Sequence, residues 1–199
     1  MPRPAGTTAQ DTRARFLEVA LDLVSERGFA GTSIRDLADR LDLTTAAMYY
    51  HFPSKDALLD ALVAPLVDGL TALAARARSG RILDVDILTE LVTLMSGEGA
   101  KVMGVLSGDP SATRRLKARC EPGQMFKDIV RGLAGSDGQL ALLRATCAVG
   151  AVQGAVFAAA HSHPGPRGAW PGFDDAERAV VVSAALAALR STPAAAVRS

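Results

Sequence analysis

A segment near the amino end, residues 33–55, most constrains the fold of this chain, because it encodes two short helices around a tight turn. Apolar residues recur there at helical spacing and give the first helix one apolar stripe: Ile34, Leu37, Ala38 and Leu41. Thr44 can cap a second helix that runs through His51. Three further apolar residues are placed to hold the pair together: Leu43, Met48 and Phe52. The segment is therefore predicted to be a helix-turn-helix.

The second helix of this pair leaves a compact polar surface outside the apolar stripe, formed by Thr45, Ala46, Tyr49 and Tyr50. A short helix cannot bury the three consecutive rings of residues 49–51 on one stripe, so at least one ring faces outward. An outward phenol hydroxyl reaches a phosphate oxygen or a base edge. Hydroxyl and methyl groups on a helix of this size suit the major groove, and the predicted partner is double-stranded DNA.

The segment resembles the DNA-binding domain of TetR-type transcriptional regulators, whose pattern is a Thr-Ser helix start, a turn, and a Tyr-Tyr-His-Phe helix followed by Ser-Lys. The matching residues are Thr32, Ser33, Thr44, Tyr49, Tyr50, His51, Phe52, Ser54 and Lys55. Asp42 and Ala46 depart from the pattern, since both stand where glycine is common in the family. Asp is among the few other residues that tolerate a left-handed backbone, so the turn is compatible with Asp42.

The resemblance implies a role for each matching side chain. Thr44, Tyr50 and His51 are expected to contact phosphates, whereas Thr45, Ala46 and Tyr49 are expected to face bases. Two further phosphate contacts follow from helix starts, which attract anions. Lys55 adds positive charge just after the predicted cap Ser54, and Thr32 and Ser33 offer hydroxyls and backbone amides, although capping alone also explains these two residues.

Composition excludes a purely charge-driven DNA binder. The chain has 199 residues, 49% of them hydrophobic, which is ample for a folded core, and a net charge of +1. Residues 1–60 carry seven basic and nine acidic groups, so the helix-turn-helix end is not basic overall. Counterion release requires several clustered Lys or Arg side chains. Affinity is therefore expected to come from a few placed contacts, doubled by dimerisation.

The location predicted for the chain is a reducing cytoplasm. Cys120 and Cys147 are far apart and unpaired in sequence, and the opening residues Met-Pro-Arg-Pro do not form a signal peptide. The longest apolar run, residues 145–160, is shorter than the roughly 20 residues that span a bilayer and consists largely of Ala and Gly. We interpret it as a buried helix of a soluble protein, with no membrane partner.

The rest of the chain predicts an all-α fold, since no alternating stretch is long enough to favour a sheet. Residues 1–55 form the first predicted domain, an N-terminal arm and the helix-turn-helix, and residues 56–199 form a helical ligand-binding and dimerisation domain. The first domain opens with a helix through Phe16 and Val24 that stops at Gly28. The second is expected to contain helices over residues 84–95, 98–106, 111–120, 122–133, 138–160 and 174–190, followed by a frayed tail.

A long helix from Ser54 to about Arg78 links the two predicted domains. Pro65 lies within it and predicts a kink or a break. Because this helix starts at the helix-turn-helix and ends in the second domain, it is the natural lever between a ligand site and DNA.

The last two helices are apolar on most of their circumference, which predicts that they are covered on most sides. Gly150 and Gly154 form a Gly-x-x-x-Gly pair that lets a neighbouring backbone approach, either inside the subunit or across a dimer. TetR-type proteins generally pair through these helices, so the resemblance implies a homodimer. Val181 and Leu186 of the final helix are assigned to the same predicted interface.

The middle helices contain the candidate ligand-binding residues. Flexible or aromatic side chains that suit an apolar cavity are Met95, Met103, Met125, Phe126, Phe157 and Trp170. Each of them is equally compatible with solid core. The resemblance implies that a cavity binds a small-molecule effector, without indicating which residues line it.

Two other features invite a functional interpretation and have simpler ones. His161 and His163 lie near a Pro- and Gly-rich loop, but two histidines without a carboxylate or thiol at ligand spacing do not predict a metal site. A basic run precedes Cys120: Arg114, Arg115, Lys117 and Arg119. A solvated helix face explains this run, and a redox-sensing thiolate is the alternative. No cofactor is predicted.

The sequence as a whole indicates a homodimeric regulator, a repressor that leaves a palindromic operator when a small inducer binds. Enzyme activity is not predicted, since the chain lacks a phosphate-cradling glycine loop and a Gly-x-Ser-x-Gly elbow. A helical small-ligand carrier or adaptor that does not bind an operator is the alternative.

Overall fold

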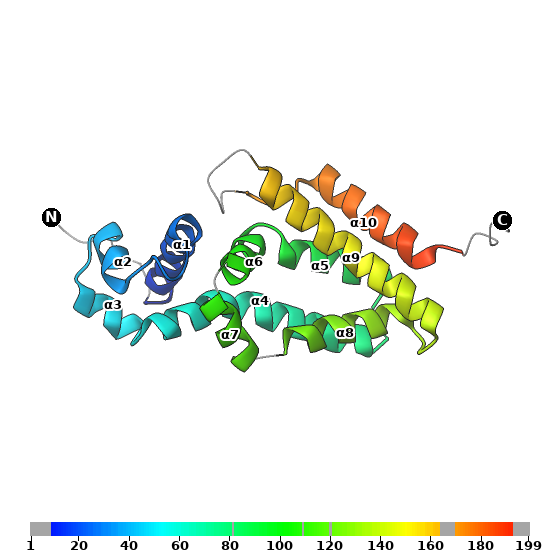
Figure 1. Cartoon of the computed structure of the whole chain (residues 1–199), viewed down its shortest axis with the longest axis horizontal. Coiled ribbons are helices and arrows are strands. Elements are labelled where there is room, and N and C mark those ends of the chain that lie inside the picture. Colours follow the sequence, from blue (N-terminus) through cyan, green and yellow to red (C-terminus); the bar gives the residue numbers. More distant parts are fainter. Residues whose placement is uncertain (1–8, 81, 109, 120, 164–169, 193–199) are drawn as a thin grey trace. The chain divides into compact units, whose positions relative to one another are not determined.

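The computed structural model describes residues 9–80, 82–108, 110–119, 121–163 and 170–192, and every regular element in these ranges is an α-helix (Figure 1). The predicted all-α fold is confirmed. The helices are α1 (Ala9–Arg27), α2 (Ile34–Arg40), α3 (Thr45–His51), α4 (Lys55–Arg78), α5 (Asp84–Met95), α6 (Glu98–Gly108), α7 (Pro110–Arg119), α8 (Pro122–Ala134), α9 (Gln139–Ser162) and α10 (Asp175–Arg190). The arm at residues 1–8 and the tail from residue 193 lie outside the described residues.

Local sequence signals set many of these helix ends. Gly28 follows α1 in a left-handed conformation with φ of 76°, and Gly135 ends α8 in the same way with φ of 64°. Asp174 caps α10 by accepting a hydrogen bond from the Glu177 backbone N–H, and the Glu177 carboxylate accepts from the Asp174 N–H in return. Each of these ends was recognisable as a glycine stop or a polar cap.

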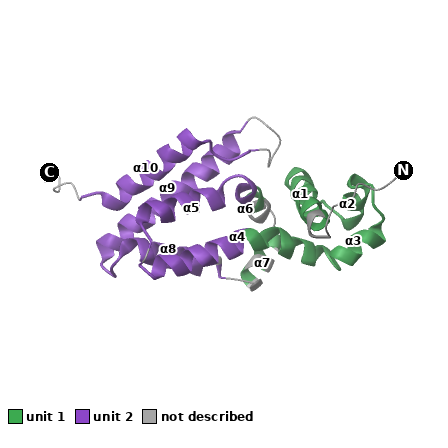
Figure 2. Ribbon diagram, turned by 180° about the vertical axis from the view of Figure 1, so that it is seen from behind, with its two compact units in different colours: residues 1–65, 101–120, 164–169 green, residues 66–100, 121–163, 170–199 purple. Residues whose placement is uncertain are grey.

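The chain folds into two compact units, coloured separately in Figure 2. Unit 1 consists of the described parts of residues 1–65 and 101–120, and unit 2 of residues 66–100, 121–163 and 170–192. Neither unit is a single stretch of chain. Helix α4 passes from unit 1 to unit 2 at Pro65 and is continuous there, so the predicted break does not occur.

Unit 1 is built around the core of the first three helices. Its fully or almost fully buried side chains include Phe16, Ala20, Leu23, Val24, Leu37, Met48 and Phe52. An ion pair of 2.7 Å between the Lys101 ammonium and Asp22 attaches α6 to α1 in the same unit. The helix-turn-helix is thus supported from behind by α1.

In unit 2, the second half of α4 is held closely by α5 and α8. A Cβ atom added at Gly132 of α8 would stand 2.6 Å from the Ala77 backbone, and one at Gly69 would stand 2.5 Å from the Leu94 side chain. At Gly132 the neighbour is backbone, which cannot move aside as a side chain can, so glycine is required there. Arg78 donates a 2.6 Å hydrogen bond to the buried Asp128 carboxylate.

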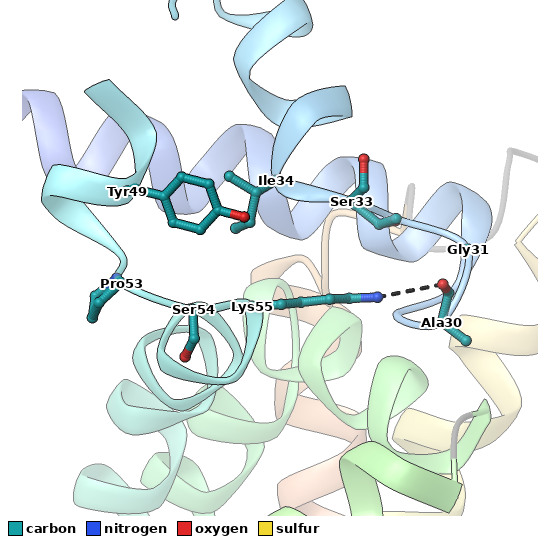
Figure 3. A pocket seen from close by; sticks show the side chains of 9 residues that line it. Ala30, Gly31, Ser33, Ile34, Tyr49, Pro53, Ser54 and Lys55 are labelled. Atoms are coloured by element: carbon teal, nitrogen blue, oxygen red, sulfur yellow. Dashed lines mark hydrogen bonds between the residues drawn. The ribbon is translucent and has the colours of Figure 1, made fainter. Parts of the chain in front are cut away.

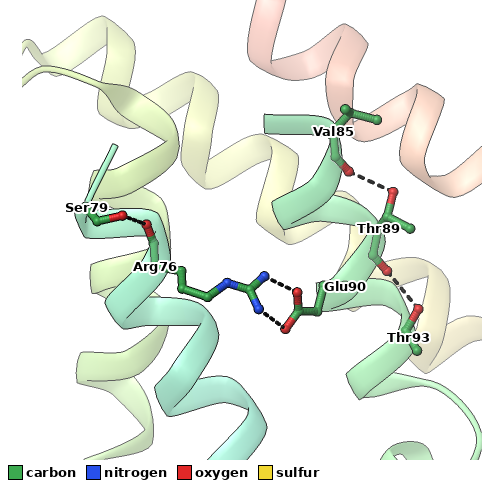
Figure 4. Close-up of polar contacts among 6 residues, drawn as sticks. All are labelled: Arg76, Ser79, Val85, Thr89, Glu90 and Thr93. Atoms are coloured by element: carbon green, nitrogen blue, oxygen red, sulfur yellow. Dashed lines mark hydrogen bonds and ion pairs between the residues drawn. The ribbon is translucent and has the colours of Figure 1, made fainter. Parts of the chain in front are cut away.

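A second ion pair joins α4 to α5 in unit 2, as Figure 4 shows. The Arg76 guanidinium lies against the Glu90 carboxylate and bonds both of its oxygens. On α5, the Thr89 and Thr93 hydroxyls donate to carbonyls one turn earlier, so these polar side chains are satisfied within their own helix.

Helices α9 and α10 pack along each other in unit 2. Their shared buried side chains are small or β-branched: Ala145, Ala148, Val149, Val152, Val156, Val181, Val182 and Ala185. At 24 residues, α9 is longer than the apolar run seen in the sequence, and both α9 and α4 are long and apolar enough to span a membrane by length and composition alone. In α4 much of that apolar surface is buried inside the protein, whereas in α9 most is not.

Candidate nucleic-acid interface

The first helix of the helix-turn-helix begins with a reciprocal cap between Ser33 and Asp36. The Ser33 hydroxyl accepts a 3.1 Å hydrogen bond from the Asp36 backbone N–H, and the Asp36 carboxylate accepts from both the Ser33 N–H and the Ser33 hydroxyl. The side-chain hydrogen bond from Ser33, followed by the backbone one, holds the pKa of Asp36 below its ordinary value. The sequence indicated capping by Ser33 as one of two interpretations, but its partner Asp36 was not singled out, although Ser-x-x-Asp is the signature of this cap.

Thr32 and Ser33 both use their hydroxyl protons inside the chain. Thr32 is buried, and its hydroxyl donates a 2.9 Å hydrogen bond to the Gly28 carbonyl, which fixes the turn after α1. The Ser33 hydroxyl is engaged with Asp36, as described above. In this structure both hydroxyls stabilise the turn and the helix start, which is the capping interpretation given for these two residues.

The turn between α2 and α3 is tight because Asp42 adopts a left-handed conformation, with φ of 54°. Among the described non-glycine residues, Asp42 alone has a positive φ. The Leu43 N–H then donates to the Ala38 carbonyl at 2.9 Å, and Thr44 caps α3 by accepting from the Ala47 N–H at 3.2 Å. Asp therefore occupies the position where the resemblance pointed to glycine.

Helix α3 is attached to the core through a single fully buried residue, Met48. The side chains of Tyr49 and Tyr50 are 50% and 87% exposed, and Ala46 is exposed beside them, whereas Thr45 is half-buried. At least one ring was expected to face outward, and two of them do. Leu43, expected to hold the helix pair together, is 36% exposed.

His51 occupies the boundary between this exposed face and the core. Its ring is half-buried and makes edge-to-face contacts with Phe16 of α1, at 4.9 Å between centroids, and with Tyr50, at 5.4 Å. Phe52 is buried directly after it, with the Arg13 guanidinium 5.0 Å above its ring. These contacts fix the end of α3 against α1.

Lys55 closes the surface at the start of α4. Ser54 caps that helix by accepting from the Ala57 N–H at 3.0 Å. The Lys55 ammonium donates to the Ala30 carbonyl at 3.3 Å and stands 4.4 Å from the centroid of the Phe29 ring. Lys55 thereby ties the start of α4 to the α1–α2 turn, a contact across 25 residues that no sequence pattern indicated.

An open hollow of about 510 Å³ is formed where these elements meet. Figure 3 shows Tyr49 and Lys55 on its wall, with the dashed hydrogen bond from Lys55 to Ala30. Its lining also includes Ser33, Ile34 and Pro53, so it draws on α2, α3 and the start of α4. A surface that brings together a phenol hydroxyl, an ammonium group and a helix start has the chemistry to hold a phosphate.

The predicted ligand-binding residues do not form one group. Met95, Met125 and Trp170 are buried in unit 2 and Phe126 is half-buried there, whereas Met103 belongs to unit 1. The Met125 sulfur accepts a hydrogen bond of 3.2 Å from Thr71, and the Trp170 ring meets Phe173 edge to face.

Phe157 departs from that set, because its side chain is 62% exposed on α9 and stacks on the His161 ring at 3.9 Å. We therefore reassign Phe157 from the predicted cavity to the outer surface. His161 makes a further 2.8 Å contact from Nδ1 to the Phe157 carbonyl.

The predicted dimer residues divide in the same way. Gly150 and Gly154 are exposed, and a Cβ atom at either would meet nothing within 4 Å, so no other part of the described subunit packs on them. Val181 is buried within the subunit and Leu186 is half-buried. This corrects the assignment of Val181 to an outward surface, because the neighbouring Val180 faces outward instead and is 68% exposed.

The residues with alternative interpretations remain scattered. Among the described residues no three His, Cys, Asp or Glu side chains gather at a metal-binding distance. His163 ends α9, while the loop that follows it, at residues 164–169, lies outside the described residues. Arg114 and Lys117 are exposed, Cys120 lies outside the described residues, and so do the side chains of Arg115 and Arg119.

The geometry of α2, the Asp42 turn and α3 defines the class of the protein. Two short helices joined by a tight turn, the second held by the buried Met48 and otherwise largely exposed, form a helix-turn-helix. Within that class, residues 16–62 match the family described as bacterial regulatory proteins, tetR family. The N-terminal segment of the chain is therefore similar to that family.

Curated relatives match part of the chain. The HTH-type transcriptional repressor KstR2 of Rhodococcus jostii (strain RHA1) is 34% identical over 71 residues, which are 35% of this chain and 35% of that protein. The tetracycline repressor protein class A from transposon 1721 of Escherichia coli is 36% identical over 126 residues, 59% of this chain and 58% of that protein. The chain thus spans from about a third to under three fifths of these relatives.

Solved structures share the fold over nearly the whole chain. Mycobacterium smegmatis AmtR superposes with a TM-score of 0.65 at 22% identity, covering 98% of this chain and 92% of that one. A transcriptional regulator from Aquifex aeolicus VF5 gives a TM-score of 0.64 at 15% identity, with coverage of 86% and 96%. At these identities the likeness concerns the fold.

Proposed function

We propose that this chain is a cytoplasmic, ligand-responsive transcriptional repressor that binds a palindromic DNA operator as a homodimer and is released by a small-molecule inducer. The single observation that carries the DNA-binding part is the exposure of Tyr49 and Tyr50 on α3, whose one fully buried residue is Met48. Large aromatic side chains are seldom left open to solvent in this way unless a partner contacts them. The relatives that share this segment are named as transcriptional repressors.

The proposed contacts follow from the exposed groups of α3 and α4. Thr45, Ala46 and Tyr49 would face base edges in the major groove, and Thr44, Tyr50 and His51 would contact the backbone. Lys55 is held by Phe29 and Ala30 on the wall of the hollow, so its charge is fixed in place rather than free on a long side chain. A fixed charge loses less side-chain entropy when it meets a phosphate.

A homodimer is proposed because it doubles these few contacts. Two-fold symmetry would place two copies of α3 about 34 to 36 Å apart, facing successive major grooves of a palindrome. The exposed apolar side of α9 and α10, which includes Gly150, Gly154 and Val180, is the surface proposed to pair.

Release by an inducer follows from differential binding. An effector that favours a subunit arrangement with the wrong α3 spacing weakens DNA affinity by the factor by which DNA weakens effector affinity. Helix α4 is the proposed link, since Lys55 at its start contacts the α1–α2 turn while Arg76 and Arg78 at its end pair with α5 and α8.

The direct test is selection of bound duplexes from random DNA by the purified full-length chain, followed by titration of the selected site at two salt concentrations. We expect enrichment of a palindrome with half-sites about one helical turn apart. A screen for compounds that release this duplex then tests the inducer. A protein that is monomeric and enriches no duplex at low salt would be a carrier or adaptor instead.

Two substitutions then locate the interface. Tyr49→Ala removes one contact per subunit, each worth about 1–3 kcal/mol, so operator affinity should fall at least about 30-fold while the protein stays folded and dimeric. Lys55→Met should also weaken binding, whereas Lys55→Arg should retain much of it. Leu83→Ala and Lys127→Met, two exposed residues outside the helix-turn-helix, are matched controls that should leave affinity unchanged. Unchanged affinity of Tyr49→Ala would place the DNA surface elsewhere.

A further inference from the structure

The exposed residues of α9 form one straight stripe along the helix. They recur at alternating spacings of three and four residues and begin near the start of α9: Leu140, Leu143, Cys147, Gly150, Gly154, Phe157 and His161. Such spacing keeps side chains on one side of a helix and is the spacing of a helix that packs against another helix along its length. The opposite side of α9 already packs inside unit 2.

The two glycines of α9 stand next to each other in the middle of this stripe. Nothing in the described subunit lies within 4 Å of the position of a Cβ atom at either. Glycine weakens a helix interior relative to alanine, and here it serves no contact within the subunit. A helix from outside the subunit can pack closely here, because Gly150 and Gly154 have no side chains to hold the two backbones apart.

Several properties of the surface favour a second copy of this chain as its occupant. The exposed residues of α9 include no Asp, Glu, Lys or Arg, and the exposed residues of α10 between Glu177 and Arg190 are also uncharged, so two copies face each other without like-charge repulsion. The 24 residues of α9 extend about 36 Å, which is long enough for two copies to pack along each other.

We infer that the two-fold axis of the homodimer passes between Gly150 and Gly154, so that the two copies of α9 cross there in antiparallel directions. This inference rests on the proposed homodimer and adds its register. Each Gly150 then faces the partner's Gly154, and Cys147 faces the partner's Phe157. The small Cys147 side chain fits opposite the large exposed Phe157 ring, and Leu143 meets the partner's His161, so large and small side chains alternate across the interface.

This register predicts that the two Cys147 residues of the dimer cannot form a disulfide with each other. Cys147 and the partner's Cys147 are offset by ten residues along the helix axis, about 15 Å, which is far beyond the Cα separation of a disulfide. An axis shifted toward the start of α9, through Cys147 itself, would bring the two thiols together instead. The alternatives therefore differ in which cysteine pairs form.

The test is oxidative cross-linking of the full chain in a Cys120→Ser background, where Cys147 is the remaining thiol. Adding Phe157→Cys should produce a covalent dimer in high yield with copper phenanthroline, and mass spectrometry should join the peptide of Cys147 to the peptide of the substituted position. Cys120→Ser alone should remain uncross-linked. Phe157 is an exposed side chain, so the substitution leaves the core intact.

A second pair guards against a local failure of the first. Leu143→Cys with His161→Cys, in a chain that also carries Cys120→Ser and Cys147→Ser, should cross-link as well. The matched control is Leu143→Cys with native Cys147 in the Cys120→Ser background, which should not, because these two positions do not face each other in this register.

The outcomes separate this inference from the proposed function. Sedimentation that shows a monomer for the Cys120→Ser protein would overturn the homodimer and the register together. A dimer in which Cys147 bonds to itself, in which the Leu143→Cys control cross-links, or in which neither predicted pair forms would overturn the register and leave the homodimer standing. Binding of the monomer to phospholipid vesicles through α9 would assign the stripe to a membrane and overturn the inference.

Discussion

Helices α3 and α9 both leave large side chains in solvent, but they do so with opposite chemistry. The exposed face of α3 has two phenol rings with hydroxyl groups, next to caps made by Thr44 and Ser54. The exposed face of α9 has leucines, a phenylalanine and two glycines, and its contacts lie on the other side of the helix. Hydroxyl groups can exchange water for a polar partner, whereas an apolar stripe gains from a partner by leaving water.

The two regions also differ in what holds them. Around α2 and α3 the main polar contacts join residues three or four apart, as in the Ser33–Asp36 cap. Around α4, α5 and α8 they join residues far apart, such as Arg78 and Asp128, together with the close approach of Gly132 to Ala77. The first region is therefore determined by local sequence and the second by tertiary packing.

The largest expected effect comes from filling the apolar stripe. Gly150→Leu should leave the monomer folded, since the site is open, but it should weaken the dimer at least about 30-fold, because overpacking costs about 1–3 kcal/mol and occurs twice by symmetry. Sedimentation equilibrium measures the change. Gly104→Leu, at an open site on α6, is the matched control. A dimer unaffected by Gly150→Leu would show that α9 is not the paired surface.

A smaller loss is expected where glycine is needed inside the subunit. Gly132→Ala places a Cβ atom against the Ala77 backbone and should lower the free energy of unfolding by about 1–3 kcal/mol, measured by chemical denaturation. Gly123→Ala, in the same helix at an open position, should be neutral or stabilising by up to about 1 kcal/mol. Equal effects of the two substitutions would contradict the tight α4–α8 contact.

A gain of stability is expected at the turn of the helix-turn-helix. Asp42→Gly relieves a left-handed residue and should raise the free energy of unfolding by about 0.5–1 kcal/mol, while Asp42→Ala should lower it, since alanine neither tolerates this conformation nor bonds locally. Thermal and urea unfolding both report the change. Destabilisation by glycine would mean that the Asp42 side chain contributes more than its backbone conformation costs.

The smallest effect concerns pH and the Ser33–Asp36 cap. Because folding lowers the pKa of Asp36, this carboxylate contributes stability above the ordinary Asp value of about 3.9, and the contribution is lost as the pH falls through the lower folded value. Asp36→Asn should therefore lose less stability than the unsubstituted protein between pH 5 and pH 2 in urea titrations.

Most of the helices could be predicted because their ends are encoded locally. Gly28, the Thr44 cap and Pro122 mark starts and stops without reference to the rest of the chain. The exposed face of α3 followed from counting rings on a short helix. In contrast, the Lys55 contact with Ala30 depends on how four helices pack, and no periodicity announces it.

It was harder to predict which side of a uniformly apolar helix faces solvent. Val180 and Val181 are adjacent and chemically identical, yet one faces solvent and the other the core, because the direction of α10 is set by α9 and α5. Phe157 was placed in a cavity for the same reason, since an aromatic residue in an apolar helix gives no indication of which side is open. Pro65 predicted a kink or a break within α4. The helix does not break there, because its packing on both sides of the proline outweighs the lost hydrogen bond.

That proline sits at the point where α4 leaves one compact unit and enters the other. A helix bends most readily where one backbone hydrogen bond is missing, so the flexibility of α4 is concentrated at this one residue. A movement at the unit 2 end of α4 would therefore bend the helix at Pro65 before it rotated the unit 1 end. Pro65→Ala would restore the missing backbone hydrogen bond and stiffen α4 without changing either end of the helix.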